Sequence, residues 1–230
     1  QNGGNCSGSF EGMGVLINAS NANISQNRIF FNGGAGIVVI SGDGNTISQN
    51  SIYGNGTVLQ SLGIDLNRDG VTLNETNDTD GGPNGLLNFP VISGAYISGS
   101  NLIVEGWSRP GATIEIFLTD ISEGTAAEGD NQLGMTSDYG EGQVYLASFI
   151  EGSASDVDSQ ITSYTDIDGN TDSTNKFRFS TPLSSGAAFG KFVTATATLT
   201  NATSEFSPES IIKAYTLITN RRITYRVKKN

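Results

Sequence analysis

The residues best suited to chemistry in this chain are acidic and amide side chains gathered between positions 65 and 80. Three of them alternate along the chain ahead of a glycine, in the spacing Asp-x-Asn/Asp-x-Asn/Asp-Gly that is typical of calcium-binding loops. Two further aspartates follow shortly afterwards. Oxygen ligands on alternate residues can surround one hard cation. We therefore predict a structural Ca2+ site formed by Asp65, Asn67, Asp69, Asp78 and Asp80.

The acidic segment departs from an EF-hand after its glycine. The bidentate glutamate of that motif is expected six residues after Gly70, where this chain has Thr76, and Glu75 comes one residue too early. Two interpretations stay open: a calcium site of another type, and a solvated acidic turn held by Asx hydrogen bonds. A second acidic segment, residues 166–172, has similar spacing, and there we favour a solvated hairpin.

Catalytic constellations are hard to assemble from this chain, so we expect a protein that is not an enzyme. There is no histidine, and the single cysteine, Cys6, has no second thiol with which to form an intramolecular disulfide. Glycosidases need two carboxylates roughly 5–10 Å apart. Residues 1–64 contain only Glu11 and Asp43 as acids and Arg28 as the one base. We assign no catalytic and no cofactor-binding residues.

The net charge of −11 argues against nucleic acid as a partner, because an acidic surface repels phosphate backbones. No apolar run approaches the roughly 20 residues that a transmembrane helix needs, so we expect no membrane span. Basic residues are concentrated near the end, where residues 218–227 predict a strand. Five interpretations of this basic end stay open: docking on the acidic body, contact with anionic surfaces, an edge strand kept soluble by charge, a cell-surface sorting signal, and the first strand of a further domain.

The composition predicts an all-β fold. Hydrophobic residues make up 36% of the chain and 30 residues are glycine, while no window shows a convincing period near 3.6 residues. Abundant Asn, Ser and Thr disfavour helices and suit short strands joined by tight turns. The organisation of the chain therefore depends on how its strands repeat and pair.

A repeat of about 23 residues occupies the first part of the chain. Residues 24–27 (I-S-Q-N) recur as residues 47–50, and residues 14–17 (G-V-L-I) match residues 36–39 (G-I-V-V) at a shift of 22. A third pass begins at residues 63–66 (G-I-D-L). Apolar residues two apart predict short strands with one buried face, and Asn or Gly between them allows sharp corners. Each repeat would stack on its neighbour, with asparagines forming ladders.

This pattern, G-I-x-I followed by N-x-I-x-x-N-x-I, resembles the repeats of right-handed parallel β-helix proteins of the pectate-lyase-like superfamily over roughly residues 10–67. The resemblance implies that residues 1–66 are the C-terminal coils of a longer β-helix, and we expect further coils upstream. Lyases of that superfamily use an Arg or Lys base beside calcium-binding carboxylates. An alternative is therefore a fragment of a polysaccharide-degrading enzyme that lacks its catalytic coils.

Residues 63–92 resemble a junction in large bacterial cell-surface proteins, where terminal β-helix coils lead into an immunoglobulin-like module. We therefore expect an acidic junction loop at residues 67–90, an immunoglobulin-like β-sandwich at 91–212, and a basic terminal strand or tail at 213–230. The chain has no Cys…Trp…Cys pattern, which excludes an antibody-type domain. Alternating apolar patterns predict strands of the sandwich at residues 101–107, 113–118, 143–150, 176–180 and 192–199.

These features predict a secreted or cell-surface module with a structural or adhesive role, stiffened by calcium, whose partner is an extracellular glycan or a surface protein. A carbohydrate-binding module is a further alternative, in which Trp107 and Tyr96 would present an aromatic platform for sugars. We favour Trp107 as a core residue, although it is out of phase by one with the alternation of Leu102 and Val104.

Overall fold

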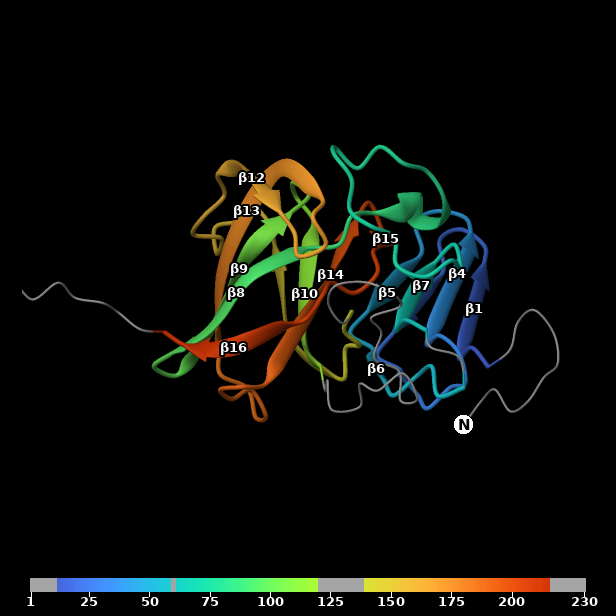
Figure 1. Ribbon diagram of the computed structural model, residues 1–230, viewed down its shortest axis with the longest axis horizontal. Helices are drawn as coiled ribbons and strands as arrows, with labels where there is room; N and C mark the ends of the chain where they lie inside the picture. Colours follow the sequence, from blue (N-terminus) through green and yellow to red (C-terminus); the bar gives the residue numbers. More distant parts are fainter. Residues whose placement is uncertain (1–11, 59–60, 120–138, 216–230) are drawn as a thin grey trace, which may run out of the picture.

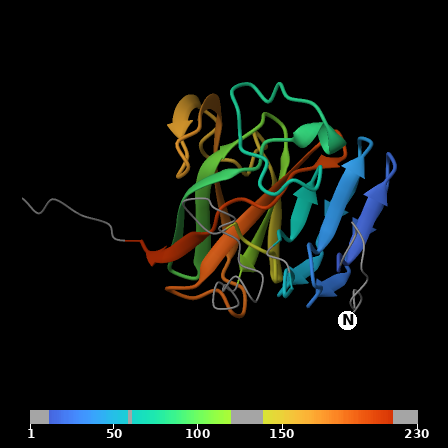
Figure 2. The ribbon, with the colours of Figure 1, turned by 45° about the vertical axis from the view of Figure 1, so that its right-hand side comes forward.

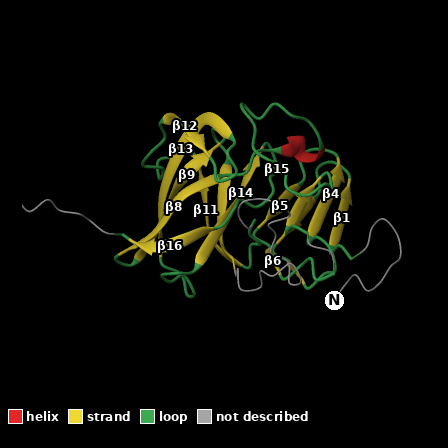
Figure 3. Ribbon diagram, in the orientation of Figure 1, coloured by secondary structure: helices red, strands yellow, loops and turns green. Residues whose placement is uncertain are grey.

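The computed structural model describes residues 12–58, 61–119 and 139–215, and these residues form an all-β fold (Figures 1 and 3). The helical element among them is a short 3₁₀ turn, η1 (Pro83–Leu86). No helix in the described ranges is long and apolar enough to cross a lipid bilayer. Cys6, Glu11 and the strand expected at residues 218–227 lie outside these ranges.

Residues 12–66, here called the parallel segment, form three short parallel sheets. The chain contributes one strand to each of the three sheets in order and then begins again at the first sheet. Within each sheet, every strand pairs in parallel with the strand one repeat later. The sheets have the orders β1–β4–β7, β2–β5 and β3–β6. In Figures 1 and 2, β1 lies farthest from the rest of the molecule. The strands are β1 (Val15–Asn18), β2 (Asn23–Ser25), β3 (Arg28–Phe30), β4 (Ile37–Ser41), β5 (Thr46–Ser48), β6 (Ser51–Tyr53) and β7 (Ile64–Leu66).

Strand pairing in the parallel segment follows the sequence repeat. Ile24 pairs with Ile47, at the shift of 23 residues seen in the sequence. Asparagines stack at the corners, where Asn32 Nδ2 donates a hydrogen bond to Asn55 Oδ1 at 2.7 Å. The residues that repeat in the sequence are therefore the ones that lie on top of one another in the structure. Below, residues 12–34 are the first repeat and residues 35–58 the second.

Gly36 opens the second repeat at a place where neighbouring repeats leave no room for a side chain. A Cβ at this position would lie 2.6 Å from the carbonyl oxygen of Gly63 and 2.8 Å from Ile52 Cγ2. Gly14 has matching surroundings in the first repeat, since its Cβ would lie 2.6 Å from the carbonyl oxygen of Gly36. The glycine of the G-I-x-I pattern is thus required by close packing between repeats.

We expect Gly36→Ala to lower the free energy of unfolding by about 1–3 kcal/mol, because overpacking forces the neighbouring backbone apart. Urea-induced unfolding measures this effect. Gly81→Ala is the matched control, since a Cβ at Gly81 meets no atom within 4 Å. Equal stability of the two variants would contradict the close contact between the repeats.

Residues 91–215, here called the antiparallel segment, form a nine-stranded sheet in the order β11–β10–β14–β16–β8–β9–β13–β12, with β15 paired to β14. β16 joins its two halves, since it pairs antiparallel with β14 and parallel with β8. Ile114 of β10 and Phe177 of β13 share one buried apolar cluster, so the two halves pack face to face. The strands are β8 (Val91–Ser98), β9 (Asn101–Ser108), β10 (Thr113–Thr119), β11 (Val144–Ile150), β12 (Ile161–Thr165), β13 (Thr171–Pro182), β14 (Phe192–Leu199), β15 (Ala202–Thr203) and β16 (Ser210–Ala214).

The five strands predicted in this segment correspond to β9, β10, β11, β13 and β14. Their apolar alternation was sufficient to locate them, because each has one face against the shared core. β16 ends at Ala214, just inside the stretch expected as a basic tail. The sequence pattern did not indicate that β16 would link the two halves of the sheet.

The apolar interiors of the two segments are continuous. Ile37, Val39 and Leu66 of the parallel segment are fully buried, and they belong to the same cluster as Phe117 and Phe206 of the antiparallel segment. The two phenylalanine rings meet edge to face, with centroids 5.4 Å apart. Burial on this scale favours unfolding of both segments together, since either one alone would expose part of the cluster to water.

Candidate functional site

The antiparallel segment covers one edge of the parallel segment with three buried glutamates. This edge is formed by β5, β6 and β7 and lies on the side of the parallel segment nearest the antiparallel segment, away from the first repeat (Figure 1). It is called the upper edge, whatever its direction in the figures. Glu115 lies in β10, Glu141 precedes β11 and Glu205 follows β15. Their exposed fractions are 3%, 5% and 1%. A buried carboxylate requires hydrogen-bond donors, and the upper edge supplies them. The three residues are called the glutamate cap.

Glu115 and Glu141 bind the second repeat. Ser48 Oγ and the backbone N–H of Gln49 donate to the two carboxylate oxygens of Glu115, at 2.7 and 2.8 Å. The backbone N–H and the side-chain amide of Asn55 donate to the two oxygens of Glu141, at 3.0 and 2.8 Å. Both oxygens of each glutamate are therefore occupied as acceptors.

Glu205 binds the third pass of the chain and the start of the junction loop. The backbone N–H groups of Leu66 and Thr72 each donate to one of its carboxylate oxygens at 2.8 Å. Burial raises the pKa of Glu205 well above its ordinary value, and the two N–H donors oppose that shift. The negative charges of Asp65 and Asp69 raise the pKa further. Glu205 thus fixes the junction loop against the end of β15.

Uncharged contacts complete the cover over the upper edge. The N–H of Ile52 donates to the carbonyl oxygen of Gly142 at 2.9 Å, and the N–H of Ile47 donates to Thr203 Oγ1 at 2.9 Å. Asn84 Nδ2, from η1, donates to the carbonyl oxygen of Thr203 at 3.0 Å. Donors from each of β5, β6 and β7 therefore end on acceptors of the antiparallel segment.

The glutamate cap was not singled out by sequence reasoning, although a signal was present. Glu115 interrupts the apolar run T-I-E-I-F-L, and a charged residue at the centre of a buried strand is rarely left without partners. The partners themselves could not be read from the sequence. Gln49 is 66 residues from Glu115, and Leu66 is 139 residues from Glu205.

The residues predicted to bind calcium are divided between two places, and the first is a turn after β7. Asp65 is the central residue of β7, is only 7% exposed, and accepts the backbone N–H groups of residues 68–70. Asn67 Nδ2 donates to Asp69 Oδ2 at 2.8 Å. The D-L-N-R-D-G motif is therefore a tight turn closed by its own first carboxylate.

Burial dominates the electrostatics of Asp65. It raises the pKa of this carboxyl from 3.8 to about 7, against the opposing effect of the three backbone N–H groups. The charge of Asp69 raises it further. Asp65 Oδ1 is buried and has no hydrogen-bond partner within the described part of the chain. A carboxyl in this position favours its protonated form.

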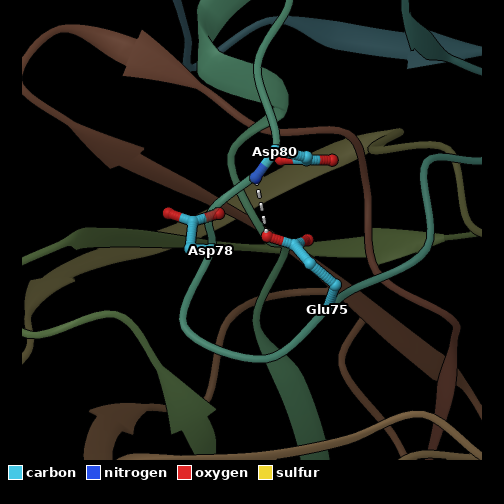
Figure 4. A group of neighbouring side chains, drawn as sticks. All are labelled: Glu75, Asp78 and Asp80. Carbon is cyan, nitrogen blue, oxygen red and sulfur yellow. Dashed lines mark hydrogen bonds between the residues drawn. The ribbon is translucent and has the colours of Figure 1, made fainter.

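Asp78 and Asp80 lie at the second place, beside Glu75, which was outside the predicted set. One carboxylate oxygen from each of the three residues lies within 4.8 Å of the others (Figure 4). Across the described ranges, these are the acidic side chains close enough to share one metal ion. The spacing of Glu75 had excluded it as an EF-hand ligand, but the loop folds back and brings it to the two aspartates.

Mutual repulsion and partial burial shape this acidic cluster. Glu75 Oε1 accepts the N–H groups of Thr79 and Asp80, the latter at 3.2 Å, whereas Glu75 Oε2 is buried without a hydrogen-bond partner among the described residues. Burial, followed by the charges of Glu75 and Asp78, raises the pKa of Asp80 to about 6. Burial also raises the pKa of Asp78. A cation between the carboxylates would relieve both the repulsion and the unpaired oxygen.

Arg109 connects the acidic cluster to the antiparallel segment. Its Nε lies 3.7 Å from Asp78 Oδ2, and its Nη1 lies 3.4 Å from Asp172 Oδ2. Its Nη2 also donates to the carbonyl oxygen of Asn77 at 3.1 Å. Part of the negative charge near Asp78 is therefore already balanced by a protein cation.

The second acidic segment, residues 166–172, comprises the turn between β12 and β13 and the first two residues of β13. Asp166 Oδ1 accepts the backbone N–H groups of Asp168 and Asn170, at 3.1 and 2.8 Å. Asp168 Oδ2 accepts a hydrogen bond from Tyr139 Oη at 2.7 Å. These contacts form a hairpin turn held by Asx hydrogen bonds.

The aromatic residues considered as a sugar platform do not form an open row. Trp107 is half-buried, its Nε1 donates to Thr162 Oγ1 at 2.8 Å, and its ring packs against Tyr164. Tyr96 lies edge to face with Tyr215. Trp107 therefore contacts side chains of β12, on the face of β9 opposite Leu102 and Val104, which explains why it falls out of phase with the core alternation.

No protein-family model matches this chain. The assignment of function therefore rests on its own residues and contacts. Two arrangements carry that assignment: the glutamate cap over the upper edge, and the acidic cluster of Glu75, Asp78 and Asp80 in the junction loop.

Proposed function

We propose that this chain is a non-catalytic structural module of a secreted or cell-surface protein, in which an immunoglobulin-like sandwich closes the end of a right-handed parallel β-helix. The observation that carries the proposal is the glutamate cap. Its three carboxylates accept backbone N–H groups from the edge of the parallel segment. An open sheet edge pairs readily with other chains, so a covered edge suits a terminal element.

The same contacts argue against a catalytic role for the buried glutamates. A general acid or base needs a free oxygen directed at a substrate. Both oxygens of Glu115, Glu141 and Glu205 accept hydrogen bonds from the protein, and all three side chains lie beneath the surface. Their role is that of a joint, in which one carboxyl group accepts hydrogen bonds from two donors at once.

Cooperative unfolding tests the proposal of a rigid joint. Trp107 fluorescence reports on the antiparallel segment, and amide NMR signals of Ile37 and Ile52 report on the parallel segment. We expect the two probes to give one coincident urea transition, because the segments share a core and a hydrogen-bonded edge. Two separated transitions would instead describe two independent domains joined by a linker.

We also propose that Glu75, Asp78 and Asp80 bind Ca2+ and thereby stiffen the junction loop. The cluster fits a hard cation in two respects: its ligands are carboxylate oxygens, and Glu75 Oε2 is buried without a donor among the described residues. Arg109 already balances part of the negative charge of the cluster, so we expect the ion to bind with modest affinity and to have a structural role. The proposed ligands are therefore Glu75, Asp78 and Asp80. Asp65, Asn67 and Asp69, which lie in β7 and the turn after it, are no longer among them.

Added Ca2+ is expected to stabilise the protein by about 2.7 kcal/mol at a concentration a hundredfold above Kd, because the ion binds only the folded loop. Thermal unfolding with calcium and with chelator measures this shift. Asp80→Asn should abolish it, whereas Asp69→Asn, in the turn after β7, should leave it intact. An unchanged midpoint at millimolar Ca2+ would show that the loop is a solvated acidic turn.

A further inference from the structure

The strand β11 ends the nine-stranded sheet without the features that usually protect a sheet edge (Figure 3). Among the described residues it pairs with β10 alone. Its seven residues, V-Y-L-A-S-F-I, include no charged residue, no proline and no glycine. Val144 and Ile150, at its two ends, are 43% and 53% exposed. Soluble proteins normally protect such an edge with charge, with proline or with a covering segment.

The strand at the other end of the same sheet, β12, is better protected. It has five residues, and aspartates lie on both sides of it in the chain, at Asp158 and Asp166. The acids on either side of β11 do not protect it in this way. Glu141 and Glu151 are 5% and 3% exposed, and both accept hydrogen bonds from the protein. The sheet therefore has one edge flanked by exposed charge and one edge without it.

Alternate residues of β11 direct their backbone groups away from β10. The N–H of Glu151 donates to the carbonyl oxygen of Ala112, its neighbour across the ladder, at 2.9 Å. Because bonded and non-bonded residues alternate in an antiparallel pair, Ser148 and Ile150 face outward. Neither of their N–H groups has an acceptor in the described ranges, and the carbonyl oxygen of Ile150 already accepts the N–H of Ser153. Ser148 therefore offers both a donor and an acceptor at this edge.

A β-bulge limits the regular part of the strand. The register between β10 and β11 shifts at Leu146, which has no residue opposite it. Residues 147–150, here called the open edge, are the regular part beyond this bulge. Ser148 lies inside the open edge, and its side chain is exposed. A symmetric contact along the open edge would therefore centre on Ser148.

We propose that the open edge binds the open edge of a second copy of this chain, antiparallel, with the two-fold axis beside Ser148. Each Ser148 then donates its N–H to the carbonyl oxygen of the other. A two-fold contact uses one surface twice, so that surface must be compatible with itself. The open edge meets this requirement because it places no like charges opposite each other, although the net charge of −11 opposes contact between copies elsewhere.

Sedimentation equilibrium of the full chain tests the proposal. We expect a reversible dimer that dissociates in Ser148→Lys, because two lysines would then face each other across the axis. Ser163→Lys is the matched control and should leave the dimer intact, since Ser163 is an exposed serine of the other edge strand, β12. Added NaCl should strengthen the dimer, because salt screens the repulsion between two acidic molecules.

Three results of this experiment would overturn the proposal. A wild-type chain that stays monomeric at millimolar concentration would show that the open edge does not bind a second copy. A dimer that persists in Ser148→Lys would have another interface. A dimer that dissociates on addition of NaCl would be held by opposite charges, which the open edge does not have.

Disulfide crosslinking tests the position of the two-fold axis. The variant combines Cys6→Ser with Ser148→Cys, and oxidised glutathione is the oxidant. Hydrogen-bonded residues opposite each other in an antiparallel pair have Cα atoms about 5.5 Å apart, a separation that a disulfide spans. We expect a crosslinked dimer from this variant and little from Cys6→Ser with Ser163→Cys. Equal yields from the two variants would contradict a contact centred on Ser148.

Amide hydrogen exchange separates this proposal from the proposed function. Exchange at Ser148 and Ile150 should slow roughly tenfold as the protein concentration rises and the dimer forms, while Leu66 and Thr72 stay protected throughout. Unchanged exchange at Ser148 and Ile150, with Leu66 and Thr72 protected, would overturn the contact at the open edge alone. Loss of protection at Leu66 and Thr72 would overturn the glutamate cap instead.

Discussion

Replacement of Glu205 with alanine is expected to lower the free energy of unfolding by about 2–4 kcal/mol. The change removes the acceptor of two buried backbone N–H groups, those of Leu66 and Thr72, and each buried donor left unpaired costs about 1–3 kcal/mol. Relief from burying a carboxyl with a raised pKa offsets part of this loss. Urea unfolding monitored by Trp107 fluorescence measures the difference.

Glu105→Ala is the matched control for this prediction. Glu105 lies in β9, is partly exposed and pairs with Arg178 at 3.0 Å near the surface. Pairs of this kind contribute about 0–1 kcal/mol. If Glu205→Ala were no more destabilising than Glu105→Ala, the hydrogen bonds to Leu66 and Thr72 would not hold the joint together.

Stability is expected to fall as pH rises from about 4 to about 7, and Asp65 is expected to account for much of the fall. The pKa of Asp65 is about 7 in the folded protein and near its ordinary value of 3.8 in the unfolded chain. Between these values the folded state keeps a proton that the unfolded state has lost, so each rise in pH favours unfolding. At about 1.4 kcal/mol per pH unit, the effect is at most ~4 kcal/mol.

The pH dependence of urea unfolding in the wild type and in Asp65→Asn tests this prediction. Asparagine cannot ionise, so the variant should lose stability less steeply across pH 4–7 and should exceed the wild type in stability at pH 8. Glu205, whose pKa is also raised, contributes to the remaining slope in the same direction. Identical slopes in the two proteins would show that Asp65 is ionised in the folded state throughout this range.

Much of the fold follows from local patterns in the sequence. The shift of 23 residues between two I-S-Q-N segments predicts the register in which Ile24 lies beside Ile47. This succeeds because neighbouring repeats use the same residue at the same place, so one sequence comparison identifies both partners. The antiparallel strands β9 and β10 were found by their alternation, because Leu102 and Val104 of β9 and Ile114 and Ile116 of β10 all pack in one apolar cluster.

The candidate site was less accessible from the sequence, because its contacts join distant residues. The carboxylate of Glu115 meets Gln49 only after both segments have folded, and nothing near Glu115 in the chain indicates that partner. Asp65 shows what the motif alone could not predict. The spacing predicts a metal ligand, and the structure adds that the side chain is buried in β7 and accepts the N–H groups of residues 68–70.

The place of Glu75 also could not be predicted from spacing. An EF-hand ligand is expected one residue later, whereas the junction loop has another geometry and places Glu75 beside Asp78 and Asp80. Alternating ligands are a reliable guide only where the backbone adopts the loop for which the spacing was defined. Here the loop is shaped by Asn74 and Asn88, whose side chains bind the neighbouring backbone.

Hydrogen exchange at four backbone amides tests the central claim most directly, because the glutamate cap is defined by them. The N–H groups of Gln49, Asn55, Leu66 and Thr72 donate to Glu115, Glu141 and Glu205. Our account predicts that all four exchange only on global unfolding, as slowly as the core amides of β14. Fast exchange at these four amides, while β14 stays protected, would contradict a closed edge and with it the proposed structural role.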